Sequence, residues 1–569
     1  MASGVVATFA FPPAQLRFVA FAALVPFLLS LRQATVRDGA VAGAAFGLAF
    51  MGVLIGWISI VGWIAWAALV FAQMLFYAGF GALAALLGRA GPVARVLGWP
   101  LVFTGFELAR SRFPLGGFEW GVLGSSQEAV STLTPLARAG GVFAISIALV
   151  AINALLSEAI AARRKRNAVL AVALAAAGAI APAMMPLGAV ANSGTIDVAM
   201  VQGNVPRGYF AGLRRGRVGP EDEIIIANHL RLTDTLAANP PELVIWPENA
   251  LDRDPFTDQE ARRAIVDATA ATGAPLLVGA IIDGPRPGTF FNANLLFDEG
   301  GRLLGRYDKM KLVPFGEYVP WQWTRSVVPA LSAIGSDGIP GDEPVVLNAN
   351  GTQIGAVICF ESSRAELVRR FVERGAEMIV VSTNNATFER TPLARQHLAL
   401  SRMRAVETGR PVLHAAISGI SAIIQPDGSI VQQAGLFRPA ILRQRIQTTS
   451  GLTPYVAYGA TIELAYGIGA AVAAIVALLF IRRRPSTVAE DDEPDFWLAP
   501  VTAAHDEPHP LLAHVDDADH SSAPPPGPSP APSSSPASVA TKDPAPPARD
   551  EPEAEAEPPR GDRGAETAQ

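Results

Sequence analysis

Long apolar runs separated by short polar breaks dominate the first 190 residues of the chain. A bilayer core about 30 Å thick requires roughly 20 residues of apolar helix to cross it. Several runs reach that length, and one more follows the central part of the chain. The pattern predicts membrane-spanning helices near residues 14–31, 39–61, 62–88, 92–109, 141–161, 167–187 and 456–481.

The pattern changes between residues 195 and 445, where short β-rich runs alternate with amphipathic stretches. Buried strands are predicted at residues 196–201, 243–246, 275–279, 354–358 and 378–381. Helices are predicted at residues 361–374 and 393–408. Strands that alternate with helices favour an α/β layered domain, in which polar residues at the strand ends are candidates for a site.

Residues 485–569 show a third pattern, rich in Pro, Ala, Ser and acidic residues with almost no large apolar side chains. Such a composition cannot bury enough apolar surface to offset the entropy of ordering the chain. We expect a disordered tail. It either stays a solvated segment or recruits a partner that the sequence does not identify.

The overall composition agrees with this division. Hydrophobic residues make up 50% of the chain and charged residues only 17%, which is outside the usual balance for a soluble protein. We predict an N-terminal transmembrane domain (1–190), an α/β domain (191–450), a C-terminal transmembrane helix (451–484) and the tail (485–569). Neither the net charge of −6 nor the placement of the basic clusters suggests nucleic-acid binding.

Basic clusters orient the membrane helices, because Lys and Arg in short loops are retained on the cytoplasmic side. One cluster lies at residues 163–166 and another at 482–484. With both clusters inside a bacterial cytoplasmic membrane, residues 190–450 lie outside it and the tail lies in the cytoplasm.

This orientation starts the chain outside, with residues 1–10 too short to span the membrane. Either a preceding helix completes the count, or this segment lies in the membrane interface. We expect no cleavable signal peptide, because the first residues lack the positive charges of one.

Three polar residues lie beside predicted apolar runs: Glu248 after residues 243–246, Lys309 before residues 312–315, and Cys359 directly after residues 354–358. A thiol needs a base to become a thiolate, and a partly buried carboxylate can be that base. A lysine ammonium would stabilise the thiolate and the oxyanion of a tetrahedral intermediate. Together these residue types make a plausible acyl-transfer site.

Each of these residues also has a simpler interpretation. Cys359 is the only cysteine, which excludes an intrachain disulfide, yet a lone cysteine at a strand end is commonly a small core residue. Glu248 could cap a helix, and Lys309 beside Lys311 could be a solvated charge. The sequence contains no zinc-ligand spacing, phosphate-binding glycine loop or Ser-His-Asp order, so we predict neither a metal nor a cofactor.

Three segments carry a family resemblance: Trp246–Glu248, Tyr307–Pro320 and Ile358–Glu361. They resemble the catalytic blocks of the apolipoprotein N-acyltransferases, the membrane branch of the nitrilase superfamily. The likeness covers about residues 10–482. It implies a multi-span helical membrane domain joined to an extracytoplasmic nitrilase-like domain with αββα layers.

The resemblance also implies a reaction with two lipid partners. Family members pass a fatty acyl chain from a membrane phospholipid, through a cysteine thioester, to the α-amino group of diacylglyceryl-cysteine in an apolipoprotein. On the matching positions Cys359 is the nucleophile, Glu248 the general base and Lys309 the oxyanion-stabilising cation. Glu317 and Glu361 match supporting acids of the site.

The segment Gly116–Gly121 resembles a further family motif, which usually has Pro in place of Glu119. Its Trp120 either lines the lipid entrance or anchors the loop at the interface. Two positions depart from the commoner pattern: Phe360 replaces Tyr, and Thr387 replaces Trp, as in the form associated with actinobacterial members. The predicted Glu-Lys-Cys triad is intact.

Two other functions remain open at this point. A membrane-anchored amidase or nitrilase-type hydrolase would use the same triad with water as the acyl acceptor, but the extensive membrane part argues against it. A catalytically silent membrane scaffold, whose tail recruits a cytoplasmic partner, is disfavoured because the complete set of chemical residues is present.

Overall fold

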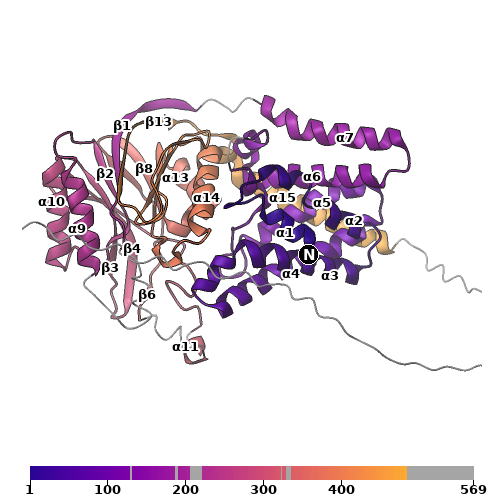
Figure 1. Cartoon of the computed structure of the whole chain (residues 1–569), viewed down its shortest axis with the longest axis horizontal. Helices are drawn as coiled ribbons and strands as arrows, with labels where there is room; N and C mark the ends of the chain where they lie inside the picture. Colours follow the sequence, from indigo (N-terminus) through magenta and orange to yellow (C-terminus); the bar gives the residue numbers. More distant parts are fainter. Residues whose placement is uncertain (129–130, 186–189, 206–220, 322, 328–334, 483–569) are drawn as a thin grey trace, which may run out of the picture. The chain divides into compact units, whose positions relative to one another are not determined.

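The computed structural model describes residues 1–128, 131–185, 190–205, 221–321, 323–327 and 335–482 (Figure 1). The tail predicted at residues 485–569 lies outside these ranges. Two members of the second basic cluster, Arg483 and Arg484, also lie outside them.

Helices make up the N-terminal part of the described chain. They are α1 (Ala2–Thr8), α2 (Val25–Leu31), α3 (Val36–Leu54), α4 (Trp63–Gly88), α5 (Pro92–Arg110), α6 (Thr134–Ala161) and α7 (Lys165–Ile180), with 3-10 turns η1 (Arg17–Phe21), η2 (Gly56–Ile60), η3 (Leu123–Gln127) and η4 (Ala181–Met184). The C-terminal helix α15 (Pro454–Arg482) returns to pack against α4, α5 and α6.

Five helices of the described residues are long and apolar enough to cross a membrane. They are Val36–Leu54, Trp63–Gly88, Thr134–Ala161, Lys165–Met184 and Pro454–Leu479. The prediction of a continuous span at residues 14–31 is wrong, because this segment is divided between η1 and α2. The predicted span at residues 92–109 forms α5, which falls outside this group and carries Arg95, Glu107 and Arg110.

Small residues let α3 and α4 approach each other closely. A Cβ atom added to Gly39 would lie 2.4 Å from the carbonyl oxygen of Gly81, and one added to Gly81 would lie 2.0 Å from that of Gly39. Close backbone contact through small residues is typical of helices packed in membranes. Any larger residue at either position would therefore push the two helices apart.

Two mixed sheets form the central domain. The first has the order β13-β1-β2-β3-β4-β5, with β6 paired to β4, and the second has the order β12-β11-β10-β9-β8-β7. The strands of the first sheet are β1 (Ala191–Gln202), β2 (Leu243–Leu251), β3 (Leu276–Asp283), β4 (Thr289–Phe297), β5 (Leu303–Asp308), β6 (Asp337–Gly338) and β13 (Ala440–Ser450). Those of the second are β7 (Val346–Ala349), β8 (Thr352–Ile358), β9 (Met378–Thr383), β10 (Val412–Ala416), β11 (Ala422–Ile424) and β12 (Ile430–Gln433).

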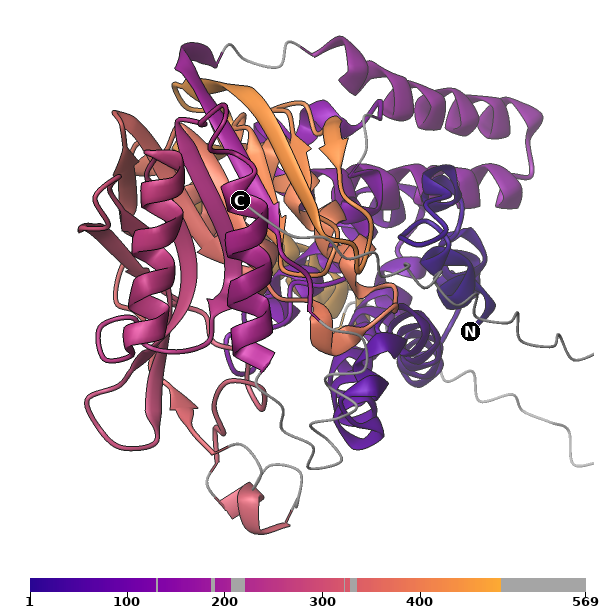
Figure 2. The same cartoon turned by 60° about the vertical axis from the view of Figure 1, so that its left-hand side comes forward.

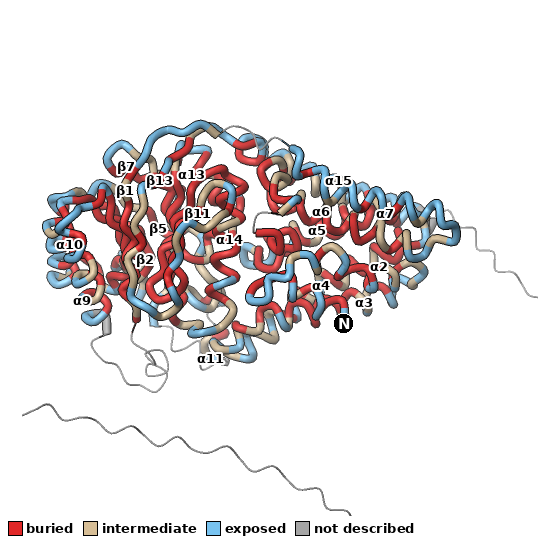
Figure 3. Tube along the Cα trace, turned by 45° about the horizontal axis from the view of Figure 1, so that its top comes forward, coloured by how far each residue is buried: buried red, intermediate tan, exposed pale blue. Residues whose placement is uncertain are grey.

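Helices cover the outer face of each sheet. Helices α9 (Glu221–Asp234) and α10 (Gln259–Thr272) pack on the first sheet, and α13 (Ala365–Glu373) and α14 (Leu393–Thr408) pack on the second (Figures 1 and 2). A separate apolar cluster joins the inner faces of the two sheets. The strands and α14 are mainly buried, whereas α7 is largely exposed (Figure 3). The predicted αββα layering is confirmed.

The local predictions were accurate for the strands and for α14, with three differences. Glu248 lies within β2 and not after it. Residues 312–315 form no named strand, and Lys309 instead follows β5 directly. The helix predicted at residues 361–374 is divided into η5 (Cys359–Ser363) and α13, because the chain bends sharply at the end of β8.

Candidate active site

Cys359 is the first residue of η5 and lies at a strained bend directly after β8. Its φ is +53°, in the left-handed region that a residue with a Cβ rarely adopts. The parallel pairing of Ile358 with Ser382 places Cys359 beside Thr383, the last residue of β9. Cys359 is only 8% exposed, so the bend does not present its side chain to open solvent.

Lys309 is held by two carboxylates. Its Nζ donates to Glu248 Oε1 at 3.2 Å and to Glu317 Oε1 at 2.7 Å, and its own side chain is buried. Asn292 Nδ2 donates to the same two oxygens at 2.8 and 3.1 Å. The second Glu248 oxygen accepts the backbone N–H of Asn384 at 2.7 Å. Residues from four separate segments therefore fix the predicted base and cation in one network.

The charges in this network set the protonation of the site. Burial alone would lower the pKa of Lys309, but the carboxylates of Glu248 and Glu317 and the nearby Cys359 raise it well above its ordinary value. Burial and the charge of Glu248 raise the pKa of the Cys359 thiol to about 12, although Lys309 acts in the opposite direction. Lys309 is thus a permanent cation, and Cys359 is a thiol that needs a base before it can attack.

Glu361 connects the loop that follows Lys309 to the bend at Cys359. Its Oε1 accepts the backbone N–H groups of Met310 at 2.7 Å and Lys311 at 3.0 Å, and its Oε2 accepts that of Ile358 at 2.8 Å. The Tyr307 hydroxyl donates to both oxygens. This carboxylate contacts the backbone on either side of the site and does not contact the thiol, which is the geometry of a positioning residue.

A group of aromatic side chains lies beside Cys359 and the residue after it. The Trp120 ring lies 5.1 Å from that of Phe360 and 5.4 Å from that of Trp57, and Phe388 meets Trp57 edge-on at 5.1 Å. Trp57 and Trp120 both donate their indole N–H to Gln396 Oε1, at 2.9 and 2.7 Å. Trp120 is only 2% exposed, unlike a tryptophan that anchors a loop in lipid.

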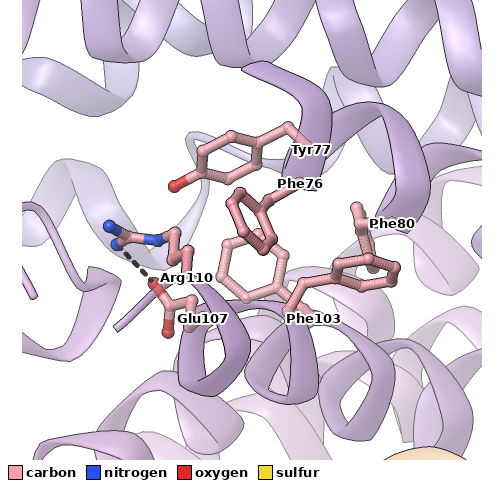
Figure 4. A pocket seen from close by; sticks show the side chains of 7 residues that line it. Phe76, Tyr77, Phe80, Phe103, Glu107 and Arg110 are labelled. Carbon is pink, nitrogen blue, oxygen red and sulfur yellow. Dashed lines mark ion pairs between the residues drawn. The ribbon is translucent and has the colours of Figure 1, made fainter. Parts of the chain in front are cut away.

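An ion pair inside the helical domain holds the loop that carries Trp120. Arg110 and Glu107 lie one turn apart on α5, beside an aromatic-lined pocket (Figure 4). Arg110 Nη1 donates to the carbonyl oxygens of Phe118 at 3.1 Å and Trp120 at 2.8 Å, and Glu107 Oε1 accepts the N–H of Leu123 at 2.7 Å. The pair thus binds the loop backbone on both sides of Trp120.

Two family models match the chain in succession. The apolipoprotein N-acyltransferase N-terminal domain matches residues 3–155, and the carbon-nitrogen hydrolase matches residues 197–454. The apolipoprotein N-acyltransferase of Mycolicibacterium smegmatis is 33% identical over 523 residues, covering 84% of this chain and 86% of that protein. The chain belongs to the apolipoprotein N-acyltransferase family.

Other relatives agree with this assignment. The apolipoprotein N-acyltransferase of Geobacter metallireducens is 30% identical over 509 residues, covering 85% of this chain and 94% of that protein. Among solved structures, an amidase from Nesterenkonia sp. aligns with a TM-score of 0.34 and 18% identity, covering 48% of this chain and 96% of that chain. The family membership, together with the match of residues 197–454 to the carbon-nitrogen hydrolase model, makes the protein a membrane acyltransferase of the nitrilase superfamily.

Several residues around the candidate site are not among the site residues that the sequence predicts. Asn292 and Thr383 contact the triad, and Gln396 holds the two tryptophans. Asn292 did leave a signal, since a buried amide interrupts the otherwise apolar β4. Arg110 is another such case, because a charged residue beside the membrane span predicted at residues 92–109 is a functional candidate by its cost. The sequence gives no signal for the contacts of Thr383 and Gln396, because their partners lie on other elements.

Proposed function

We propose that this protein transfers a fatty acyl chain from a membrane phospholipid to the N-terminal amine of a diacylglyceryl-cysteine in an apolipoprotein. The observation that carries the proposal is the position of Cys359, on a strained bend beside a carboxylate–lysine–carboxylate network. Family membership supports the choice of a lipoprotein acceptor over water.

In the first half-reaction Glu248 accepts the thiol proton of Cys359, and the sulfur attacks an ester carbonyl of the phospholipid. Lys309 stabilises the oxyanion that forms on that carbonyl, and Glu317 keeps the ammonium in place. The intermediate collapses to a thioester, and the leaving alkoxide of the lysophospholipid takes the proton from Glu248. The acyl chain is then held on the enzyme.

In the second half-reaction the α-amine of the acceptor attacks the thioester. Glu248 removes a proton from the amine nitrogen, and Lys309 again stabilises the oxyanion. The tetrahedral intermediate expels the Cys359 thiolate, which regains a proton from Glu248. An amide forms, and the enzyme returns to its starting state with atoms and charge in balance.

The contacts at the two ends of the last α6 segment support the proposed orientation of the helical domain. Glu158, near the C-terminus of α6, pairs with Arg32 and Arg95 and lies shortly before the basic residues 163–166. Directly after the non-helical break at Gly140 and Gly141 within α6, the Val142 N–H donates to Glu407 on α14 of the α/β domain. This supports a cytoplasmic basic end and an extracytoplasmic α/β domain at residues 191–450, with the tail in the cytoplasm.

Within this proposal Trp120 contributes to the lipid entrance. Trp120 belongs to the helical part of the chain, and its ring contacts that of Phe360, the residue after the proposed nucleophile, at a centroid distance of 5.1 Å. An acyl chain could then reach the thiol without leaving an apolar environment.

Transfer assays with purified protein in detergent micelles test the proposal. We expect a fluorescent phospholipid and a diacylated lipopeptide to give a triacylated lipopeptide and a lysophospholipid. Omission of the lipopeptide should leave the acyl group on Cys359, which intact-mass measurement detects. Release of free fatty acid without acylation of the lipopeptide would identify a hydrolase instead.

Substitution of the nucleophile provides the second arm. Cys359→Ala should abolish both transfer and the acyl adduct, and Cys359→Ser should nearly do so, because a hydroxyl is a far weaker nucleophile at neutral pH. Thr235→Ala is a suitable control, since that exposed hydroxyl donates only to the Leu232 carbonyl. Full transfer by the alanine variant would refute the mechanism.

A further inference from the structure

Thr383 places a buried hydroxyl against the nucleophile. Its Oγ1 lies 3.3 Å from Cys359 Sγ, and the residue is fully buried at the end of β9. The same oxygen lies 3.2 Å from Asn385 Oδ1 and 3.4 Å from His397 Nδ1. A hydroxyl has one proton to donate, so these three groups compete for it.

The protonation of His397 is set by its other nitrogen. His397 Nε2 lies 3.0 Å from the carbonyl oxygen of Cys359, which can only accept, and 2.8 Å from the Ser362 hydroxyl, whereas Nδ1 lies 3.3 Å from Asn385 Oδ1. The shorter contact with the carbonyl favours the tautomer that has its proton on Nε2. Burial lowers the pKa of His397 to about 4, so the ring is neutral and Nδ1 is left as an acceptor. In the resting thiol state, therefore, the Thr383 proton has good acceptors in His397 and Asn385.

The ionised Cys359 sulfur needs a hydrogen-bond donor, and Lys309 has too few free protons to be its only one. Two of the three ammonium protons are directed to Glu248 and Glu317, which leaves one for the oxyanion on the substrate carbonyl. When Glu248 takes the thiol proton, the sulfur becomes the most strongly charged acceptor near Thr383. Because a hydroxyl rotates about its C–O bond, Thr383 can redirect its proton to the sulfur without any movement of the backbone.

We propose that Thr383 is a catalytic residue whose hydroxyl proton turns from His397 and Asn385 to the Cys359 sulfur whenever that sulfur is ionised. The proposal deepens the acyl-transfer function and rests on Cys359 being its nucleophile. Thr383 keeps its proton throughout, since the thiol proton goes to Glu248. In the thioester the sulfur is neutral and a weak acceptor, so the hydroxyl turns back. It returns to the sulfur when the thiolate is expelled.

Alkylation of the full-length protein by iodoacetamide tests this directly, because Cys359 is the only cysteine. The rate is followed against pH in detergent micelles by intact-mass measurement. In Thr383→Val, which keeps the shape but lacks the hydroxyl, we expect the rate at neutral pH to fall about tenfold and the apparent thiol pKa to rise by about one unit. Thr383→Ser retains the donor and should stay within about twofold of the wild type.

Thr408→Val is the matched control. Thr408 is also buried, but its hydroxyl donates to the Arg404 carbonyl within α14, so its loss should leave the pH profile unchanged. Profiles of Thr383→Val and wild type that coincide would overturn the proposal. So would an equal loss in Thr383→Ser and Thr383→Val, which would indicate packing and not donation.

The acyl-transfer assay separates this inference from the proposed function. Thr383→Val should lower kcat about tenfold with little change in KM, because the hydrogen bond forms only with the ionised sulfur. If the wild type transfers no acyl chain, the proposed function fails, yet the alkylation profile still decides whether Thr383 stabilises the thiolate.

Discussion

Gln396 makes a sharp test of how the aromatic wall beside Cys359 is held. Its Oε1 accepts both indole N–H groups of Trp57 and Trp120, and its Nε2 donates to the carbonyl oxygens of Pro12 at 3.1 Å and Leu54 at 3.0 Å. The amide thus uses two donors and two acceptor positions, which is its full capacity. Gln396→Leu keeps a similar volume and removes all four bonds.

The expected cost follows from the groups left behind. Gln396→Leu leaves two buried indole N–H groups and two backbone carbonyls without this hydrogen-bond partner, and each unpaired buried polar group costs about 1–3 kcal/mol. At the lower end of that range the four groups together cost about 4 kcal/mol. We therefore expect a large loss of stability and, because Trp120 loses its anchor beside Phe360, a loss of acyl transfer.

A double-mutant cycle with Trp57→Phe measures one of these bonds. Phenylalanine has no indole N–H, so Gln396→Leu should cost about 1–3 kcal/mol less in the Trp57→Phe background than in the wild type. Denaturant unfolding in detergent micelles, followed by circular dichroism, gives the four free energies. Equal costs in both backgrounds, or an unfolding midpoint that Gln396→Leu leaves unchanged, would refute the reasoning.

Two further predictions concern Glu361 and His397. Glu361→Gln replaces one carboxylate oxygen by an NH₂ group that faces N–H donors, so the loop after Lys309 and the bend at Cys359 should separate. We expect the transfer rate to fall at least about tenfold, whereas Glu366→Gln, on the exposed surface of α13, should leave it unchanged. Equal activities of the two variants would contradict the positioning role of Glu361. The folded-state pKa of His397, about 4, lies below its unfolded value, so the unfolded chain binds more protons and stability should fall as the pH drops from about 6.5 to about 4. Denaturant midpoints across that range, compared between wild type and His397→Gln, measure this; a slope that the substitution leaves unchanged would show that His397 does not contribute.

Much of the architecture could be read from local patterns. The strands at residues 354–358 and 378–381 and the helix at residues 393–408 were predicted almost to the residue, because buried strands and amphipathic helices have their own hydrophobic periods. The predicted span at residues 14–31 is wrong, since this apolar run of nearly sufficient length folds as η1 followed by α2. Hydropathy measures length and composition but not continuity.

For the candidate site too, the sequence predicts some residues, and only the structure shows their contacts. Glu248, Lys309 and Cys359 are predicted as site residues because their sequence neighbours resemble family blocks; taken alone, Cys359 and Lys309 favour the simpler structural interpretation. The structure brings Lys309 into contact with Glu248 across 61 residues of chain, and the pairing of β8 with β9 brings Thr383 to Cys359.

The sequence by itself therefore determined the kinds of element, the family resemblance and the membrane character of this protein, and it predicts which residues carry the chemistry. The tertiary structure alone decided which hydroxyl faces the sulfur, which amide pairs with Trp57 and Trp120, and how Arg110 holds the loop of Trp120. The physical reason is that hydrophobic periodicity is a property of neighbouring residues. A buried hydrogen bond instead depends on the distance between atoms that the fold brings together from remote parts of the chain.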